Sequence, residues 1–290
     1  MTEFLNAVAE FPFLQQALLA GVIAGIACGV VGSYVVARRI SYIAGGVAHC
    51  TLGGMGAAQY LNRVQGWSEV EPLHGAVVAA LIAALIIGWV SLKAKQREDT
   101  VISALWATGM AAGILFISQT PGYYEDLMSY LFGNILLVSR EKLLLIAALD
   151  VVVVGLGLLF YNKFLAVCFD EEFARLRGLN VEFYYLLLLC LTALTVVVLV
   201  TVVGLVLVIA LLTLPVAIAN QFTVRLWRVM IAASLISIAL TVAGLAISYR
   251  PELPPGATTI VLAGGLYLVV LTASSVLMSR ATRSNARRAN

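Results

Sequence analysis

The chain has 290 residues, of which 62% are apolar and only 11% are charged. A soluble domain of this size cannot cover so much apolar surface with so few charged side chains, so the composition excludes a water-soluble fold and indicates a protein embedded in membrane lipid. The formal net charge is +3, but the basic residues occur singly and in pairs between apolar segments. They form no continuous basic stripe, so we expect no nucleic-acid partner.

Long apolar segments follow one another along the chain. A helix needs about 20 mainly apolar residues to cross a bilayer, and the segments predict about nine such helices. They lie near residues 12–37, 42–61, 74–92, 100–118, 143–161, 183–201, 204–224, 229–247 and 258–279. We therefore expect one all-α, polytopic membrane bundle over residues 1–290.

One further apolar segment, residues 127–138, is too short to cross and predicts an interfacial or re-entrant helix. If it does not cross, the basic residues fall into two unequal groups. The larger group lies near residues 38–39, 93–97, 163–177, 225–228 and 280–288, and the other side has only Arg63, Arg140, Lys142 and Arg250. The positive-inside rule then predicts an outside N-terminus and a cytoplasmic C-terminus. Because no Lys or Arg precedes Arg38, we do not expect a cleaved signal peptide.

Glycines in the first span repeat every fourth position, at Gly21, Gly25 and Gly29, with Gly32 on an adjoining position. Small residues at this spacing let two helix backbones approach closely, whether the second helix belongs to the same chain or to another. The cysteines have no C-x-x-C spacing, so neither a disulfide framework nor a zinc knuckle is predicted. They are expected to be small buried side chains: Cys28, Cys50, Cys168 and Cys190.

His49 is the most informative polar residue inside a predicted span. Helical spacing places Gly46, His49, Gly53 and Gly56 on one face of the second span. The absence of side chains around the imidazole leaves room either for a neighbouring backbone or for a water-filled path. A neutral imidazole is a common ligand of zinc and other borderline metals, although a packed histidine bonded to one polar neighbour explains the residue as well.

Two other metal-binding side chains lie in or near the spans. Asp150, inside the fifth span, is suited to hold a cation or to pair with His49, and equally to make a polar contact between helices. His74 lies at the mouth of the third span beside Glu69 and Glu71, where a solvated side chain is the simpler expectation.

The predicted cytoplasmic loop, residues 162–181, contains an amphipathic stretch from Asp170 to Leu179. Phe173, Leu176 and Leu179 follow a spacing of three that gives one apolar face, and Gly178 is placed to end a short helix. Such a helix, lying beneath the membrane, is suited to dock on a cytoplasmic partner. The alternative is a solvated linker.

The chain has no phosphate-binding loop of the form G-x-x-x-x-G-K-[ST], and it has no H-E-x-x-H or G-x-S-x-G motif. We therefore expect a non-enzymatic chain, and any ATP must be hydrolysed by another protein.

Several segments along most of the chain together resemble one known family. They are Arg38–Arg39–Ile40–Ser41 before the span with His49 and Gly54, Glu98–Asp99, residues 129–136 (SYLFGNIL), residues 170–179, residues 211–217 (LLTLPVA) and residues 253–257 (LPPGA). In these segments the sequence resembles the permease subunits of zinc and manganese ABC importers, of the ZnuB and MntB type.

The resemblance implies a homodimer in the bacterial inner membrane, with a pair of ATPase subunits below and an extracytoplasmic metal-binding protein above. The divalent metal is then the substrate, no cofactor is permanently bound, and ATP is bound by the partner. Residues 123–138 would form the outer gate, and the pathway would be lined by Gly45, Gly46, Gly53, Phe132 and Asn134. The coupling helix would use Asp170, Glu171, Phe173, Ala174, Arg175, Gly178 and Leu179.

One position departs from the family pattern. Relatives usually have an aspartate four residues before the histidine of the second span, and this chain has Gly45 there. Either another residue such as Asp150 supplies the oxygen ligand, or the ion is bound more weakly, or the substrate differs. An imidazole favours zinc modestly and does not exclude manganese or iron.

Two alternatives of other classes stay open at this stage. One is an ion-coupled carrier or channel that uses His49 and Asp150 as a proton relay. The other is an ABC permease for a larger cargo, such as a metal chelate or cobalamin.

Overall fold

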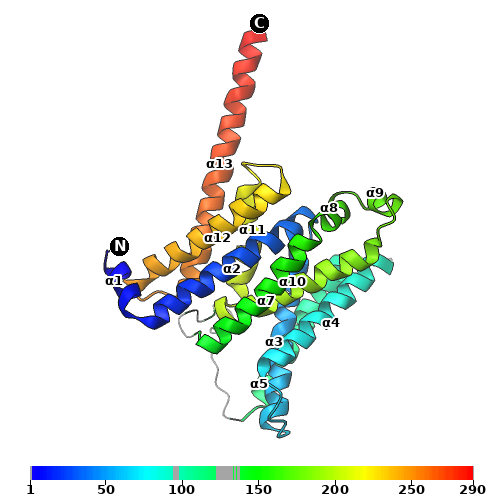
Figure 1. The fold of residues 1–290 in the computed structure, drawn as a ribbon, viewed down its shortest axis with the longest axis vertical. Coiled ribbons are helices and arrows are strands. Elements are labelled where there is room, and N and C mark those ends of the chain that lie inside the picture. Colours follow the sequence, from blue (N-terminus) through cyan, green and yellow to red (C-terminus); the bar gives the residue numbers. More distant parts are fainter. Residues whose placement is uncertain (1, 94–97, 122–132, 134, 136–137, 290) are drawn as a thin grey trace.

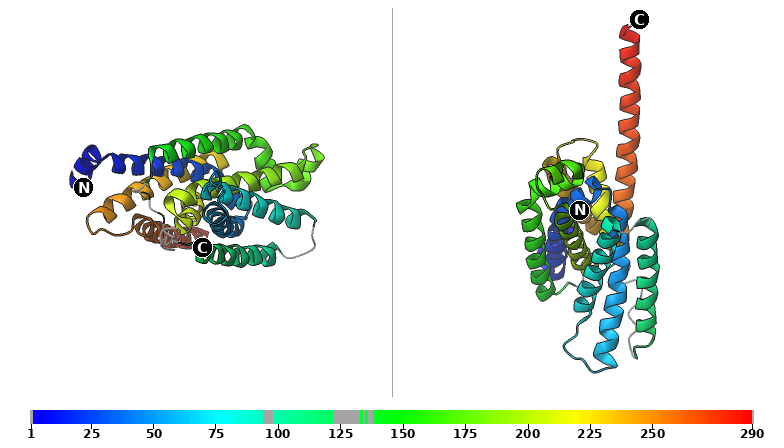
Figure 2. Two further views of the ribbon diagram at one scale, coloured as in Figure 1. Left: turned by 90° about the horizontal axis from the view of Figure 1, so that it is seen from below. Right: turned by 90° about the vertical axis from the view of Figure 1, so that its right-hand side faces the viewer.

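The computed structural model describes residues 2–93, 98–121, 133, 135 and 138–289. These residues form a bundle of α-helices (Figure 1). The helices are α1 (Thr2–Glu10), α2 (Pro12–Ala37), α3 (Ser41–Arg63), α4 (Pro72–Lys93), α5 (Glu98–Ser118), α7 (Arg140–Leu159), α8 (Tyr161–Phe169), α9 (Glu171–Leu176), α10 (Val181–Val203), α11 (Leu205–Ala219), α12 (Leu226–Tyr249) and α13 (Pro255–Ala289). Figure 2 shows that the C-terminal part of α13 extends beyond the rest of the bundle.

Each predicted span coincides with one helix, but the count of nine spans is not confirmed. In the described part of the chain, 7 helices are long and apolar enough to cross a membrane: α2, α4, α5, α7, α10, α12 and α13. Two of the predicted spans, those in α3 and α11, are not among these helices, for different physical reasons. Helix α11 has 15 residues, so its length of about 22 Å is less than the roughly 30 Å of a hydrocarbon core.

Helix α3 is long enough to cross, at 23 residues, but its glycines and polar side chains make it less apolar than the seven. It does not need an apolar exterior because it lies between α5, α4 and α10 inside the bundle. Burial by other helices therefore takes the place of contact with lipid along most of α3.

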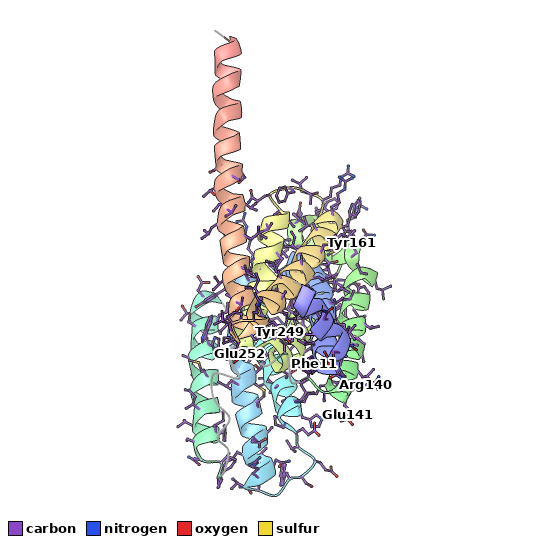
Figure 3. All side chains as sticks on the ribbon, turned by 90° about the vertical axis from the view of Figure 1, so that its left-hand side faces the viewer. Phe11, Arg140, Glu141, Tyr161, Tyr249 and Glu252 are labelled. Atoms are coloured by element: carbon purple, nitrogen blue, oxygen red, sulfur yellow. The ribbon has the colours of Figure 1, made fainter. Side chains whose placement is uncertain are left out.

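The helices run alternately between two ends of the bundle. In Figure 3, Phe11, Arg140, Glu141, Tyr249 and Glu252 lie toward one end, and Tyr161 lies toward the other. Helix α7 therefore begins at the first end and leads to α8 at the second. The C-terminal end of α2, the start of α10 and the short helices α8 and α9 all gather at that second end (Figure 1).

The glycine repeat of the first span packs against a helix of the same chain. Gly21, Gly25 and Gly29 of α2 face α12, where a Cβ on Gly25 would lie only 2.7 Å from Cγ1 of Ile238. A Cβ on Gly29 would lie 2.6 Å from Cα of Ser234. The structure thus assigns this close approach to α2 and α12.

Helix α3 uses its glycines on two sides. A Cβ on Gly53 would lie 2.7 Å from the carbonyl oxygen of Gly109 in α5, and one on Gly56 would lie 2.8 Å from that of Gly113. On another side, Gly54 meets the backbone of α4. The sequence left open whether the glycine face around His49 admits a neighbouring backbone or a water-filled path. At Gly53 and Gly56 the structure shows a neighbouring backbone.

A glycine also separates α10 from α11. Gly204 has a φ of 83°, a left-handed conformation that glycine adopts without steric cost, and here the first helix ends and the next begins. Gly133, with a φ of 68°, packs directly on the backbone of Val203 and Gly204. Most of residues 123–138, including the predicted short helix, lies outside the described residues.

Candidate functional site

His49 lies in the interior of the bundle and is only 7% exposed. Its imidazole stacks on the indole of Trp106 in α5, with ring centroids 4.3 Å apart and an interplanar angle of 22°. The buried Nδ1 atom has no hydrogen-bond partner among the described residues. Buried polar atoms in proteins are nearly always paired, so an unpaired ring nitrogen marks a position prepared for a ligand or a proton donor.

The indole of Trp106 also covers the position four residues before the histidine. A Cβ on Gly45 would lie 3.0 Å from Cζ3 of Trp106 and 3.8 Å from Cδ1 of Ile209 in α11. A side chain at residue 45 would therefore compete with the tryptophan for space. One turn before His49, at Gly45, the neighbouring side chains are therefore aromatic and apolar, and residue 45 itself supplies no carboxylate.

Asp150 of α7 is also buried, at 5% exposed, and neither carboxylate oxygen has a partner in the described structure. Among the described residues the main packing partners of α7 are α2, α10 and α8, and α3 is not one of them. Asp150 and His49 thus belong to different helix contacts, and a shared ion between them stays a prediction.

The described residues include no group of three or more His, Cys, Asp or Glu side chains arranged to hold a metal ion. His74 is exposed, and its Nδ1 accepts a hydrogen bond from the backbone N–H of Glu71 at 3.2 Å. It is therefore an exposed side chain, as the simpler expectation had it, and it also caps the start of α4.

The remaining predicted lining residues are placed as follows. Gly46 faces Ile102 of α5, with Cγ2 2.8 Å from a Cβ built on the glycine. Gly53 is in backbone contact with α5. Phe132 and Asn134 lie outside the described residues.

The amphipathic stretch forms the short helix α9 that the sequence predicts. Asp170 caps its N-terminus, where Oδ1 accepts a hydrogen bond from the N–H of Phe173 at 2.9 Å. Gly178 ends it with a φ of 75°. The N–H of Gly178 donates to Arg175 O at 2.9 Å and that of Leu179 to Ala174 O at 3.1 Å, a pattern that closes many helix C-termini.

The two faces of α9 differ in exposure. Ala174 is fully buried against the protein, whereas Phe173 is 48% exposed and Leu176 is 88% exposed. Arg175 is exposed and Leu179 is half-buried. The helix therefore presents two large apolar side chains outward, and its opposite side packs against the bundle through Ala174.

Two residues of evident structural importance were not singled out from sequence. Trp106 shares a helical face with Gly109 and Gly113, a spacing visible in the sequence that predicts contact with a glycine-lined partner helix. In the sequence, Arg38 served as an indicator of topology and as part of one segment of the family resemblance, with no role of its own. The structure shows its side chain in an ion pair with Glu171 of α9.

Comparisons with known proteins bear on the whole chain. The sequence profile of the ABC 3 transport family matches residues 10–274. An uncharacterized membrane protein of Synechocystis is 43% identical, over 93% of this chain and 94% of that one. A probable metal transport system membrane protein of Chlamydia trachomatis is 41% identical, over 90% and 88% of the two chains. The manganese transport system membrane protein MntC of Halalkalibacterium halodurans is 32% identical, over 92% and 89%.

Two solved structures are also similar. PsaBC from Streptococcus pneumoniae, solved in complex with a Fab, matches with a TM-score of 0.82 and 29% identity, covering 93% of this chain and 94% of that one. An inward-facing putative metal-chelate type ABC transporter matches with a TM-score of 0.71 at 16% identity, which shows a shared fold alone.

Proposed function

Since this chain belongs to the ABC 3 transport family, we propose that it is the membrane-spanning permease subunit of an ATP-driven importer of a divalent metal ion. The observation that supports this most directly is His49, a buried imidazole with an unpaired ring nitrogen. In a transport protein such a nitrogen provides a transient ligand for the passing ion.

Manganese and zinc are the candidate substrates. A neutral imidazole suits zinc and other borderline metals, and this favours zinc modestly. The relatives from Halalkalibacterium halodurans and Chlamydia trachomatis are named as manganese and metal transport proteins, which favours manganese or a related metal. A competition experiment with both ions against one radioactive tracer decides between them.

The energy source is a separate ATPase, since the sequence has no phosphate-binding loop of its own. Helix α9 is the coupling helix of this proposal, and its exposed Phe173 and Leu176 insert into a groove of the ATPase. The permease works as a homodimer, with one ATPase under each copy and a metal-binding protein above.

In this arrangement α8, α9 and the C-terminus lie on the cytoplasmic side of the bacterial inner membrane, and the N-terminus lies outside. The excess of basic residues on the same side as α9 supports this orientation. Residues 123–138 lie at the outer gate. Gly133 contacts Gly204 at the end of α10 that is remote from α9, and this supports an outer location.

The experiment compares the two histidines of the chain. The permease is reconstituted in proteoliposomes with its ATPase and binding protein, and ATP-dependent accumulation of radioactive Mn²⁺ or Zn²⁺ is measured. We expect His49→Ala to lower uptake while the complex still assembles. His74→Ala is the matched control, because His74 is exposed at a helix start, and we expect it to retain uptake. Unchanged uptake by His49→Ala would remove this residue from the mechanism.

A second candidate is import of a metal chelate. It is favoured by Gly45, which leaves His49 without a carboxylate on the preceding turn. An unlabelled chelate that competes better than the free ion would favour this candidate.

A further inference from the structure

The side chain of Arg38, at the C-terminal end of α2, contacts three other elements at once. Its Nη2 forms an ion pair with Oε1 of Glu171 in α9. Its Nη1 donates a hydrogen bond to the carbonyl oxygen of Val167 in α8 at 3.2 Å. The guanidinium lies over the ring of Tyr185 in α10, with Cζ 5.1 Å from the ring centroid. One side chain thus joins the two short helices to two membrane-spanning ones.

The neighbouring turn of α2 extends this connection. Tyr34 precedes Arg38 by four residues, so the two side chains lie on the same face of the helix. The hydroxyl of Tyr34 donates to the carbonyl oxygen of Gly157 in α7 at 2.8 Å, and its ring packs edge-on against Phe164 of α8 with centroids 5.3 Å apart. On the far side of the network, the hydroxyl of Tyr185 and Oγ of Ser91 in α4 are hydrogen-bonded at 3.1 Å.

Partial burial makes these contacts more than surface interactions. The side chains of Arg38 and Glu171 are 23% and 32% exposed, and Tyr185 is 1% exposed. Shielding from water strengthens an ion pair relative to one on an open surface. The planar guanidinium makes the ion pair, the carbonyl hydrogen bond and the ring contact together, a combination that a lysine ammonium does not reproduce.

The geometry of α9 makes it suited to move as one unit. It has 6 residues and is capped at both ends, by Asp170 and by the turn at Gly178. Its large apolar side chains point outward and Glu171 reaches back to Arg38. A force applied to the outer face of α9 therefore reaches the end of α2 through this ion pair.

We propose that Arg38 is a positioning residue that transmits displacement of α9 to α2 and α10, so that ATP hydrolysis by the partner and ion movement through the membrane stay coupled. This inference rests on the proposed function. Arg38 touches neither the ion nor ATP, and its role is to keep the two movements linked.

The test uses the complete complex of permease, ATPase and binding protein in proteoliposomes. Both ATP hydrolysis and accumulation of Mn²⁺ or Zn²⁺ are measured, and the result is expressed as ions imported per ATP hydrolysed. We expect Arg38→Gln to lower this ratio by at least about fivefold, while ATP hydrolysis continues. Glu171→Gln removes the other half of the ion pair and is expected to lower the ratio in the same way. The double variant should be little worse than either single variant, because both changes remove one interaction.

Arg39→Gly is the matched control. Arg39 is exposed and has a φ of 63°, a conformation that glycine adopts more easily than arginine. This variant removes a neighbouring positive charge and leaves the contacts of Arg38 in place, so we expect it to keep the wild-type ratio.

The outcomes separate the two proposals. A wild-type complex that accumulates neither metal with ATP rejects the proposed function, and the role of Arg38 with it. Wild-type uptake together with an unchanged ratio in Arg38→Gln and Glu171→Gln rejects the role of Arg38 alone. If Arg38→Gln fails to assemble, Glu171→Gln decides: a lowered ratio supports the proposal, and an unchanged one overturns it.

Discussion

The imidazole of His49 and the indole of Trp106 lie face to face, with centroids 4.3 Å apart. The two residues come from α3 and α5, whose backbones meet through glycines one and two turns further along. This close approach brings the tryptophan over the histidine, so the packing of the two helices determines which side of the imidazole is accessible.

Removing the indole should expose the imidazole. Trp→Ala in a packed core costs about 3–5 kcal/mol, and because Trp106 is only half-buried we expect Trp106→Ala to lower the free energy of unfolding by about 2 kcal/mol. Trp106→Phe should cost less, since a ring remains to stack. In a His74→Asn background, which leaves His49 as the single histidine, diethyl pyrocarbonate should modify the imidazole faster in Trp106→Ala. Equal modification rates in both proteins would show that the indole does not shield His49.

Gly45 and Trp106 should behave as a coupled pair. A Cβ at residue 45 would lie 3.0 Å from the indole, so Gly45→Asp should be destabilising alone and better tolerated together with Trp106→Ala. A double-mutant cycle from thermal unfolding should give a coupling of about 1–2 kcal/mol. The double variant also has a carboxylate one turn from the imidazole, so we expect it to bind Mn²⁺ or Zn²⁺ more tightly than the wild type. Additive stability changes would contradict the coupling.

The helix contact between α2 and α12 can be tested with two Gly→Ala substitutions. In Gly29→Ala the new Cβ would lie 2.6 Å from Cα of Ser234, and crowding of this kind typically costs about 1–3 kcal/mol. Gly155 of α7 has no atom within 4 Å of a built Cβ, so Gly155→Ala should be neutral or stabilising by up to about 1 kcal/mol. Thermal unfolding in detergent compares the two. Equal unfolding temperatures would mean that α2 and α12 do not meet at Gly29.

Much of the bundle was predictable because membrane lipid imposes one simple rule, an apolar segment of sufficient length, on each crossing helix. Helix α9 was predictable as well, since its cap at Asp170 and its stop at Gly178 are local in sequence. Helix α8 was missed because its nine residues mix apolar and polar side chains at the end of a longer apolar segment.

The surroundings of the site were less predictable. The glycine face around His49 was visible in sequence, but which helix occupies it depends on contacts between segments far apart in the chain. Trp106, and the ion pair between Arg38 and Glu171, are long-range relationships of this kind. No local pattern distinguishes them from an ordinary aromatic residue in a span or an ordinary charge beside one.

Asp150 should reduce stability in its present position. Both carboxylate oxygens are buried and unpaired, and such a group typically costs about 1–3 kcal/mol. Asp150→Leu keeps the branched shape of the side chain and removes its polar atoms, so it should raise the free energy of unfolding by about 1–3 kcal/mol. It should also lower ATP-dependent metal uptake. Chemical denaturation and uptake assays of the same preparation test both parts. A stabilised variant with wild-type uptake would place Asp150 outside the ion's route.

The central claim is that this chain moves a metal ion only when a separate ATPase drives it. The most direct measurement is accumulation of radioactive Mn²⁺ or Zn²⁺ in proteoliposomes that contain the permease, with and without the ATPase and the binding protein. We predict accumulation only in vesicles that contain all the components and are supplied with ATP. Accumulation by the permease alone, without ATPase or ATP, would contradict the account and indicate an ion-coupled carrier or a channel.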